Sequence, residues 1–318
     1  MQTTAVVVTY DPPADFPDHL GLWLSQIDKL ILVDNGSPPA WREQMRRLVQ
    51  EKYNDSVEFI LNPANLGIAA ALNQGFARLM EQGHGLTFVF DQDSLPGAGM
   101  VAEMLDIYED RSKRGRVAIV APNVEIPAAR TGSSFLIPWG RFLFRRARCT
   151  DERVLENVSI VIASGALYDL EAYRQIGRFR EDFFIDYVDT EYCLRARRRG
   201  YEVVVACKAS LYHQLGSQRE GHFGLLTMHP TFHSALRWYF ISRNRVPMLL
   251  QYGVRFPHWF FYELVVNTYG LVRLVLFEDH KVAKVRAIIL GTWDGLANRL
   301  GPISLARQTV LAPAGQNG

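Results

Sequence analysis

Strand-like and helix-like segments alternate through the first 120 residues of the chain, and this alternation restricts the fold more than any other feature. Short runs rich in Val, Ile, Leu and Phe are each followed by a segment with the length and period of a helix. Such alternation is typical of an α/β protein with a mostly parallel sheet and helices on both faces, and the continuous apolar runs indicate strands buried on both sides. The predicted strands are 5–9, 30–33, 57–61 and 86–90, and the predicted helices are 14–25, 41–52 and 68–82.

The pattern changes toward the C-terminus. After residue 122, strands and turns mix up to about residue 210, and long helical patterns run from Thr231 to about Leu300. A chain of 318 residues is long enough for one large domain with an appendage. We therefore expect an α/β domain over residues 1–230 and a helical region over residues 231–318.

The fourth predicted strand ends in two carboxylates. Residues 86–94 read Leu-Thr-Phe-Val-Phe-Asp-Gln-Asp-Ser, so Asp91 and Asp93 stand at the carboxyl end of a buried strand, where open α/β sheets bind ligands. Two carboxylates this close repel each other unless a cation lies between them. A hard divalent ion shared with a diphosphate is the natural occupant. A polar turn without a ligand is the alternative reading of this motif by itself.

Polar loops follow all four predicted strands. Because parallel strands share one direction, these loops should open at the same edge of the sheet. Together they offer an aromatic ring, carboxylates and side-chain amides, which suits the base, ribose and diphosphate of a nucleotide sugar. No GxGxxG motif follows the first strand and no GxxxxGK[ST] motif occurs, which argues against dinucleotide and ATP-phosphate binding. The loops contain Thr9-Tyr10, Asp34-Asn35-Gly36-Ser37, Asn62-Pro63-Ala64-Asn65-Leu66-Gly67 and Asp91-Gln92-Asp93-Ser94.

A second acidic cluster lies near residue 190. Asp186, Asp189 and Glu191 fall within six residues, between a strand-like segment at 183–185 and a basic helix. Asp189 is a good N-cap for that helix, and acidic charge is favoured in a first helical turn. The functional alternative is a carboxylate that takes a proton from an attacking hydroxyl group.

These motifs resemble those of the GT-A fold, family 2 inverting glycosyltransferases, and are most similar to bacterial rhamnosyltransferases that use dTDP-L-rhamnose to build O-antigen and other surface polysaccharides. The resemblance covers residues 1–245 and is loose beyond them. Its motifs are Val6-Val7-Val8-Thr9-Tyr10, Val33-Asp34-Asn35-Gly36-Ser37, Asn65-Leu66-Gly67, Asp91-Gln92-Asp93-Ser94, Ser164-Gly165, Phe183 to Tyr192, Tyr212-His213-Gln214-Leu215-Gly216 and, more loosely, Tyr239 to Asn244.

The resemblance implies a role for individual residues. It implies that Asp189 is the catalytic base, and that Asp91, Asp93 and His213 bind Mn²⁺ or Mg²⁺, with His229 and His233 as weaker alternatives to His213. An inverting transfer places the base opposite the leaving nucleotide diphosphate. The residues implied to contact nucleotide or substrate are Thr9, Tyr10, Asp34, Asn65, Gly67, Asp91, Gln92, Gly165, Asp186 and Glu191.

Charge and aromatic residues concentrate in the C-terminal part of the chain. Residues 237–318 carry ten Lys and Arg against four Asp and Glu, a net charge of +6, whereas residues 1–236 have a net charge of −4. Aromatic and aliphatic residues with interspersed arginines are typical of helices that lie on a membrane surface. Polar residues such as Glu263 and Arg273 argue against a spanning helix. We expect peripheral membrane contact, packing in a homo-oligomer, or both; a lipid-linked saccharide acceptor would explain membrane affinity.

Three cysteines without CxxC or zinc spacing, and no recognisable secretory leader, indicate a reducing cytosol. The prediction is a metal-dependent, inverting glycosyltransferase that moves L-rhamnose from dTDP-L-rhamnose to a hydroxyl of a glycan or lipid-linked saccharide acceptor in surface polysaccharide synthesis and does not bind nucleic acid. The alternatives are a family 2 enzyme that uses a UDP-sugar (galactofuranose or glucose) and a non-catalytic nucleotide-binding scaffold. A nucleotidyltransferase would carry a Gly-rich basic loop after its first strand, and Tyr10-Asp11-Pro12-Pro13 is not one. Acceptor, linkage and oligomeric state are left open.

Overall fold

The computed structural model describes residues 2–53, 55–125, 133–213, 221–223, 226–228 and 233–311. The chain forms two compact units, here called the sheet unit and the helical unit. The sheet unit comprises Met1–Ile137, Arg146–Phe184 and Val188–Gln214, and the helical unit comprises Pro138–Arg145, Ile185–Tyr187 and Leu215–Gly318. The short segments 138–145 and 185–187 therefore belong to the helical unit although they precede residue 230. A single boundary in the sequence does not separate the two units.

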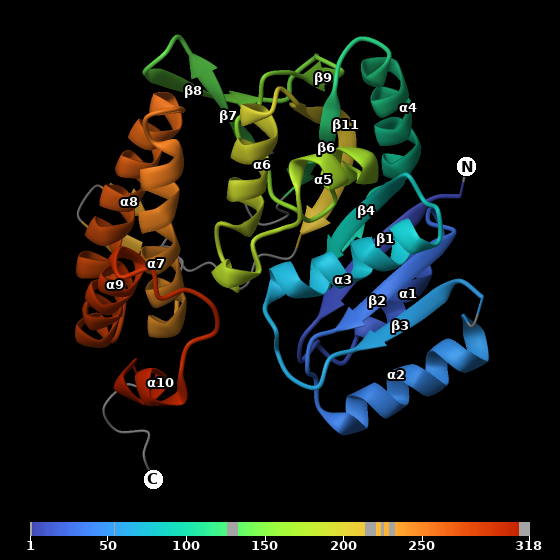
Figure 1. The fold of residues 1–318 in the computed structure, drawn as a ribbon, viewed down its shortest axis with the longest axis horizontal. Coiled ribbons are helices and arrows are strands. Elements are labelled where there is room, and N and C mark those ends of the chain that lie inside the picture. The colour runs from blue at the N-terminus through green and yellow to red at the C-terminus, as the bar shows by residue number, and fades with distance from the viewer. Residues whose placement is uncertain are drawn as a thin grey trace. The chain divides into compact units, whose positions relative to one another are not determined.

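A mixed sheet of nine strands lies at the centre of the described part of the sheet unit (Figure 1). The strand order is β3-β2-β1-β4-β10-β6-β11-β5, with β9 paired to β11. Strands β3, β2, β1 and β4 are mutually parallel, which confirms the predicted α/β class and the four predicted strands. Bounds are β1 Thr4–Thr9, β2 Lys29–Asp34, β3 Val57–Leu61, β4 Leu86–Asp91, β5 Ser94–Pro96, β6 Val117–Glu125, β9 Val154–Leu155, β10 Leu167–Asp169 and β11 Glu202–His213.

Helices cover both faces of this sheet. On one face, Phe16, Leu20 and Trp23 of α1 join residues of α2, α4 and the strands in one buried core. On the other face, α3 lies so close to β1 that a Cβ atom on Gly75 would be 2.5 Å from Cγ1 of Val6. The predicted helices are confirmed. Bounds are α1 Phe16–Leu24, α2 Pro39–Lys52, α3 Ile68–Glu81, α4 Met100–Ser112, α5 Leu170–Ile176 and α6 Val188–Arg198.

The segment at 183–185, expected to be strand-like, is a turn, so that prediction is wrong. A single 3₁₀ turn, η1, covers Glu181–Phe183, and the backbone then takes positive φ at Phe184 (65°), Asp186 (62°) and Tyr187 (64°). Phe183 is fully buried. The apolar residues of this segment therefore reflect burial within a turn and not a strand period.

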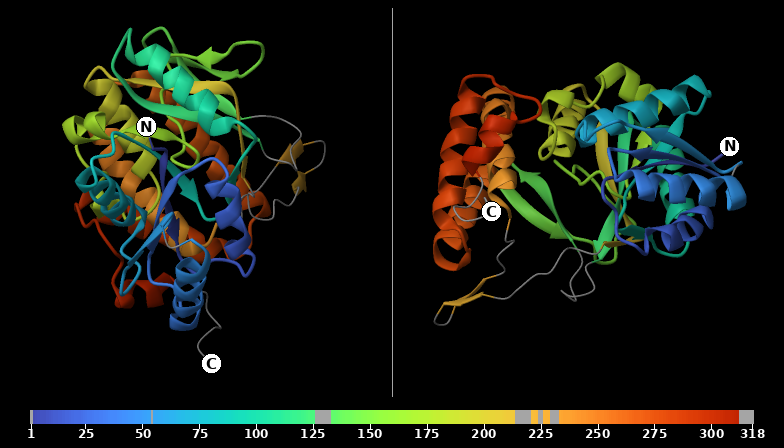
Figure 2. Two further views of the ribbon diagram at one scale, coloured as in Figure 1. Left: turned by 90° about the vertical axis from the view of Figure 1, so that its right-hand side faces the viewer. Right: turned by 90° about the horizontal axis from the view of Figure 1, so that it is seen from below.

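The described part of the helical unit is built mainly from four helices, and α7 and α9 pack closely along one another (Figure 2). Glycine on α9 permits this approach, because a Cβ atom on Gly291 would lie 2.3 Å from the carbonyl oxygen of Tyr239. The predicted helical C-terminal region is confirmed. Bounds are α7 Ala235–Tyr252, α8 Pro257–Phe277, α9 Lys281–Leu296 and α10 Leu305–Leu311. Two small two-stranded sheets pair β7 Ser134–Trp139 with β8 Leu143–Arg148, and β12 Gly221–Phe223 with β13 Leu226–Met228.

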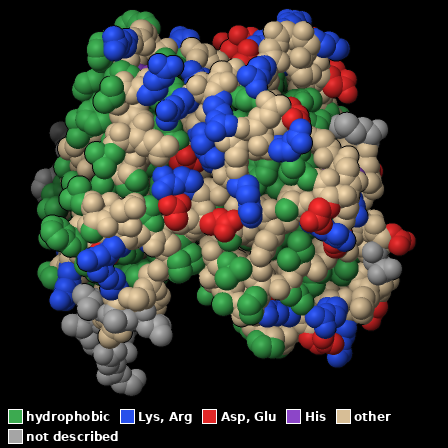
Figure 3. All heavy atoms as spheres, in the orientation of Figure 1, with side chains coloured by type: hydrophobic (Ala, Val, Ile, Leu, Met, Phe, Trp, Pro, Cys, Tyr) green, Lys and Arg blue, Asp and Glu red, His purple; other side chains and the backbone are tan. Residues whose placement is uncertain are grey.

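Helices α8 and α9 expose many apolar side chains, and Figure 3 shows hydrophobic groups gathered over them. On α8 the exposed apolar residues run from Phe261 to Leu276 and include the consecutive Leu264, Val265 and Val266, so they form a broad apolar surface around much of the helix. Within the described residues, α8 is long and apolar enough to cross a membrane, with mean hydropathy 1.4 and 17% of that window buried. The exposed apolar residues of these helices are Phe261, Leu264, Val265, Val266, Tyr269, Val272, Val275, Leu276, Val282, Val285, Ile289, Trp293 and Leu296.

A disulfide joins Cys149, just after β8, to Cys207 on β11, while Cys193 is a buried free thiol. The two bonded cysteines are 58 residues apart in the sequence, with a Cα–Cα distance of 5.2 Å. Their spacing gives no hint of this pairing. A disulfide is unusual in the reducing compartment that the sparse cysteine count had indicated.

Candidate active site

The carboxyl ends of the four parallel strands meet at one edge of the sheet, as predicted. Thr9 pairs with Asp34 and Asp34 with Leu61, while Val8 pairs with Asp91. The predicted nucleotide and metal residues on the first four loops therefore lie in adjacent strand ends. This edge is the candidate active site.

Asp34 is a fully buried carboxylate held by several donors. It forms an ion pair with Arg42, with 2.7 Å between Nε and Oδ2. The backbone N–H of Ser37 donates to both of its oxygens at 3.2 and 3.3 Å, and the Thr9 hydroxyl lies 3.4 Å from Oδ1. These contacts fix the loop after β2 in one conformation. Sequence reasoning missed Arg42, although it stands in the helix that directly follows this loop.

Side-chain amides join the loops after β2 and β3. Asn35 Nδ2 donates to Asn65 Oδ1 at 3.0 Å, and Asn35 Oδ1 accepts from the N–H of Leu66 at 3.0 Å and from Asn62 Nδ2 at 3.2 Å. Asn65 Oδ1 also accepts from the N–H of Gly67 at 2.9 Å. Because buried amides need such partners, this network holds the two loops at a fixed spacing.

The loop after β4 is attached to its neighbours by Gln92. Its side-chain oxygen accepts from the N–H of Tyr10 at 2.9 Å, and its carbonyl oxygen lies 3.1 Å from Nδ1 of His19. The Tyr10 ring itself is half exposed, as a ring available for stacking would be. Gln92 therefore positions the loop that carries Asp91 and Asp93.

The predicted metal ligands are only partly described. The side chain of His213 and the whole of His229 lie outside the described residues. Within the described part of the chain, no three His, Cys, Asp or Glu side chains gather as a metal site. The backbone of His213, however, pairs with Ser94, the residue that follows Asp93.

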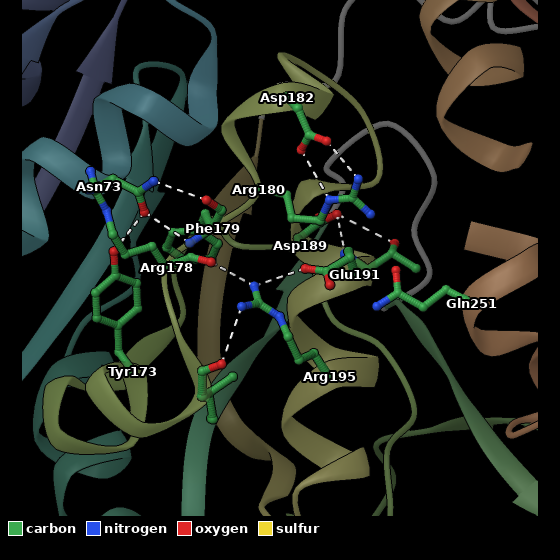
Figure 4. Close-up of polar contacts among 12 residues, drawn as sticks. Asn73, Tyr173, Arg178, Phe179, Arg180, Asp182, Asp189, Glu191, Arg195 and Gln251 are labelled. Atoms are coloured by element: carbon green, nitrogen blue, oxygen red, sulfur yellow. Dashed lines mark hydrogen bonds and ion pairs between the residues drawn. The ribbon is translucent and has the colours of Figure 1, made fainter. Parts of the chain in front are cut away.

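The predicted base, Asp189, lies in the first turn of α6, one residue inside the helix start at Val188. Its Oδ1 accepts from the N–H of Thr190 at 2.7 Å. The sequence predicted Asp189 as the N-cap, and this is wrong because the helix already begins at Val188. The predicted acidic first turn is confirmed. Figure 4 shows Glu191 turned toward Arg195, which it meets at 2.9 Å. Glu191 is buried, so it anchors α6.

Tyr168 is a buried phenol whose pKa responds to the charges of both acidic motifs. It lies on β10, next to β4, and its phenol is fully buried. Burial raises the pKa of Tyr168 well above its ordinary value, and the charges of Asp189 and Asp91 both act in the same direction. Both carboxylates therefore lie within electrostatic range of the same buried phenol.

Gly165 and Asp186, which were predicted to contact nucleotide or substrate, have contacts within the protein. Gly165 has φ of +76°, and a Cβ atom there would lie 2.7 Å from Cγ of Pro122, so this glycine is required by packing. Next to it, Ser164 Oγ accepts from the N–H of Asp91 at 3.0 Å. Asp186 groups with the helical unit, where Arg237 meets its Oδ1 at 3.3 Å, and burial raises the pKa of Asp186.

Comparison with known proteins gives a consistent result. The family model described as Glycosyl transferase family 2 matches residues 5–177. The dTDP-rhamnosyl transferase RfbF of Shigella flexneri is 25% identical over 313 residues, which cover 93% of this chain and 96% of that protein.

Two solved structures share the fold. TarS residues 1–349 of S. aureus align with a TM-score of 0.59 at 12% identity, over 94% of this chain and 82% of that chain. The mannosyltransferase PcManGT from Pyrobaculum calidifontis, solved with GDP-Man and Mn²⁺, aligns with a TM-score of 0.54 at 13% identity, over 97% of this chain and 78% of that chain. The expected GT-A glycosyltransferase fold is confirmed.

Proposed function

This chain belongs to glycosyl transferase family 2 and is a glycosyltransferase, and on that premise we propose that it transfers L-rhamnose from dTDP-L-rhamnose to a hydroxyl of a glycan or lipid-linked saccharide. The observation that carries the proposal is the sheet edge, where four adjacent strand ends bring Asp34, the Asn35–Asn65 amides and the Asp91-Gln92-Asp93 loop together. The similarity to a dTDP-rhamnosyl transferase over nearly the whole chain supports the choice of donor. A UDP-sugar is the alternative donor.

The nucleotide would lie against the first three strand ends. Asp34 is buried and Asn65 Oδ1 already accepts two hydrogen bonds, so these residues would shape the loops against which the base and ribose lie, while Tyr10 offers an exposed ring for stacking. Gly67 and Gln92 hold these loops in place. Recognition of the nucleotide would then depend on a network that is already formed in this structure.

A divalent cation would lie at the fourth strand end. Asp91 and Asp93 would supply hard carboxylate oxygens, and His213, whose backbone pairs with Ser94, would be the third ligand. Two carboxylates and an imidazole suit Mn²⁺ slightly better than Mg²⁺, and a structural neighbour was solved with Mn²⁺. When bound, such an ion stabilises the negative charge that develops on the leaving diphosphate.

Asp189 would act as the general base. As the acceptor oxygen forms a bond to the anomeric carbon, the bond from that carbon to the diphosphate oxygen breaks, and the acceptor proton passes to the Asp189 carboxylate. Attack from the face opposite the leaving group inverts the anomeric carbon. Glu191 is buried against Arg195 and would hold the helix that carries the base.

The apolar face of α8 and α9 would rest on an anionic lipid surface at the cytoplasmic side of a membrane. An exposed apolar surface of this extent is uncommon on a monomeric soluble protein. The exposed cations Arg255, Lys281 and Arg286 stand on or beside the same helices, which gives the face charge complementarity to acidic headgroups. Membrane attachment would bring the enzyme to a lipid-linked acceptor. A second copy of the chain is the other occupant that a test can detect.

The donor and metal proposals are tested together by thermal unfolding with a panel of nucleotides and nucleotide sugars, each with and without Mn²⁺. We expect the largest rise in Tm with dTDP or dTDP-L-rhamnose plus Mn²⁺, because a ligand that binds only the folded state raises its stability. A larger rise with UDP or a UDP-sugar would support the alternative donor. No rise with any nucleotide would contradict the proposed function.

A further inference from the structure

The turn at residues 184–187 is backbone of an unusual kind. Phe184, Asp186 and Tyr187 all have positive φ, although none is glycine. Such conformations are costly for residues with a Cβ atom and persist only where the surrounding structure holds them. The turn leads directly into α6, and Asp189 is the second residue of that helix. Contacts that hold this turn therefore also fix the position of the first turn of α6, which carries Asp189, the proposed base.

Asn244 on α7 holds the middle of the turn. Its Nδ2 donates to the carbonyl oxygen of Ile185 at 2.8 Å and to that of Asp186 at 3.0 Å. The Asn244 side chain is fully buried. Its orientation is fixed from the other end, because Oδ1 accepts from Nε of the buried Arg243 at 3.0 Å. An amide is the required group here, since one end must donate to two carbonyls while the other accepts from a guanidinium.

The end of the turn is held by an ion pair between α7 and α8. Arg245 Nε meets Glu263 Oε1 at 3.0 Å and donates to the Tyr187 hydroxyl at 3.1 Å, while that hydroxyl donates to Glu263. Glu263 is buried, and burial raises the pKa of Tyr187 well above its ordinary value, so the phenol stays a donor.

Phe184, the first residue of the turn, belongs to the sheet unit and is held within it. The N–H of Ile68 donates to the carbonyl oxygen of Phe184 at 2.8 Å. A Cβ atom on Gly67 would lie 2.6 Å from that same oxygen. Phe184 is thus held by the loop after β3 within the sheet unit, and residues 185–187 are held by α7 and α8 within the helical unit.

We propose that Asn244 is a positioning residue for transfer: through the carbonyls of Ile185 and Asp186 it fixes the turn, and thereby the start of α6 and the Asp189 carboxylate. The proposal rests on the proposed function, in which Asp189 is the base. Asn244 touches neither donor nor acceptor. Its loss should slow the chemical step and leave nucleotide binding intact, because a displacement of about 1 Å in a catalytic group can cost about 10²-fold in rate.

The test uses Asn244→Asp, which keeps the size of the side chain and replaces the Nδ2 donor by a second acceptor facing two carbonyls. Activity is the release of dTDP from dTDP-L-rhamnose with Mn²⁺ and with water as acceptor. We expect kcat to fall about 10- to 100-fold, with the Kd of dTDP and Mn²⁺ within about twofold of wild type. The acidic limb of the kcat–pH profile should also move, because a displaced carboxylate changes its surroundings.

Tyr239→Phe is the matched control. It removes a buried hydrogen bond from the same helix, the 2.9 Å contact to Asp294 on α9, without touching the turn. It should lower the Tm and leave kcat and the pH profile unchanged. Tyr187→Phe is the milder second variant if Asn244→Asp does not fold, and it should lower kcat several-fold with Kd unchanged. Equal losses of activity in Tyr239→Phe and in the turn variants would overturn the proposal.

Asp189→Asn separates this inference from the function on which it rests. If Asp189→Asn is inactive while Asn244→Asp and Tyr187→Phe keep wild-type kcat, Asn244 has no positioning role and the proposed base stands. If Asp189→Asn keeps wild-type kcat, the proposed base fails and the inference fails with it.

Discussion

The sheet unit and the helical unit distribute polar and apolar residues in opposite ways. In the sheet unit, β1 and β2 are buried almost throughout, and polar side chains collect in loops at one edge. In the helical unit, ion pairs such as Lys284–Glu278 and Arg245–Glu263 are buried, while α8 and α9 expose apolar side chains. One unit has the order expected of a water-soluble protein, and the other partly reverses it.

This contrast indicates that different interactions organise the two units. The sheet unit needs a large apolar core. Its site can be built from short side chains, because the parallel strands all end at the edge where these side chains lie. Buried ion pairs add little net stability, because desolvation offsets their attraction. We therefore interpret the buried polar contacts of the helical unit as fixing the positions of segments, the turn at 185–187 among them.

The largest effect should come from the edge of the sheet unit. Asp93→Ala should abolish transfer and remove the Mn²⁺-dependent rise in Tm with dTDP, because the loss of one carboxylate leaves a divalent ion with too few hard ligands. The measurements are dTDP release and thermal unfolding with and without Mn²⁺. Asp55→Ala, a surface change remote from the strand ends, is the control. Near wild-type turnover in Asp93→Ala, or full activity in EDTA, would contradict the metal assignment.

A smaller but still large effect is expected at the start of α6. Asp189→Asn keeps the size of the side chain and cannot accept a proton at neutral pH. Turnover should fall on the order of 10²–10⁴-fold, while the Kd of the nucleotide stays near wild type. Isothermal titration beside the activity assay checks both. A loss of nucleotide binding together with turnover would instead assign Asp189 to the metal or to the fold.

The reversed surface of the helical unit predicts salt-sensitive binding to anionic vesicles. Each Lys or Arg near such a surface contributes about 1 kcal/mol, so Lys281→Glu with Arg286→Glu should weaken co-sedimentation markedly, and Leu264→Glu should weaken it further. Leu22→Glu is the matched control, because Leu22 is similarly exposed on α1 of the sheet unit. Absence of sedimentation, together with a dimer in light scattering that Leu264→Glu dissociates, would assign the face to a second copy.

The smallest predicted effect is a pH dependence of stability within the helical unit. Burial, followed by the charge of Arg237, lowers the pKa of His233 from 6.5 to about 4. Between these values the unfolded chain binds the proton and the folded protein does not, so stability should fall as the pH drops from 6.5 to 4 and be unaffected by this group above 6.5. Urea unfolding of His233→Gln should show less of this loss. Parallel stability curves for variant and wild type would contradict it.

Much of the sheet unit follows from the sequence alone. The four strands, the helices between them and the meeting of Thr9, Asp34 and Asp91 at one edge were predictable, because burial on a strand or helix leaves a local period and parallel strands share a direction. The position of the carboxylate pair at the end of a strand is equally local. These features depend on residues that are close together in the sequence, so the sequence alone is sufficient to predict them.

Only the tertiary structure decided the rest. The Arg42–Asp34 pair, the Cys149–Cys207 disulfide and the contacts of Asn244 with the turn 58 and 59 residues earlier join groups whose sequence spacing carries no signal. The sequence of residues 183–185 predicts a strand where the structure has a turn, because an apolar run looks alike in a strand and in a buried turn. A helix that is apolar nearly all round, such as α8, likewise does not reveal which face will be covered, because that depends on which elements fold against it.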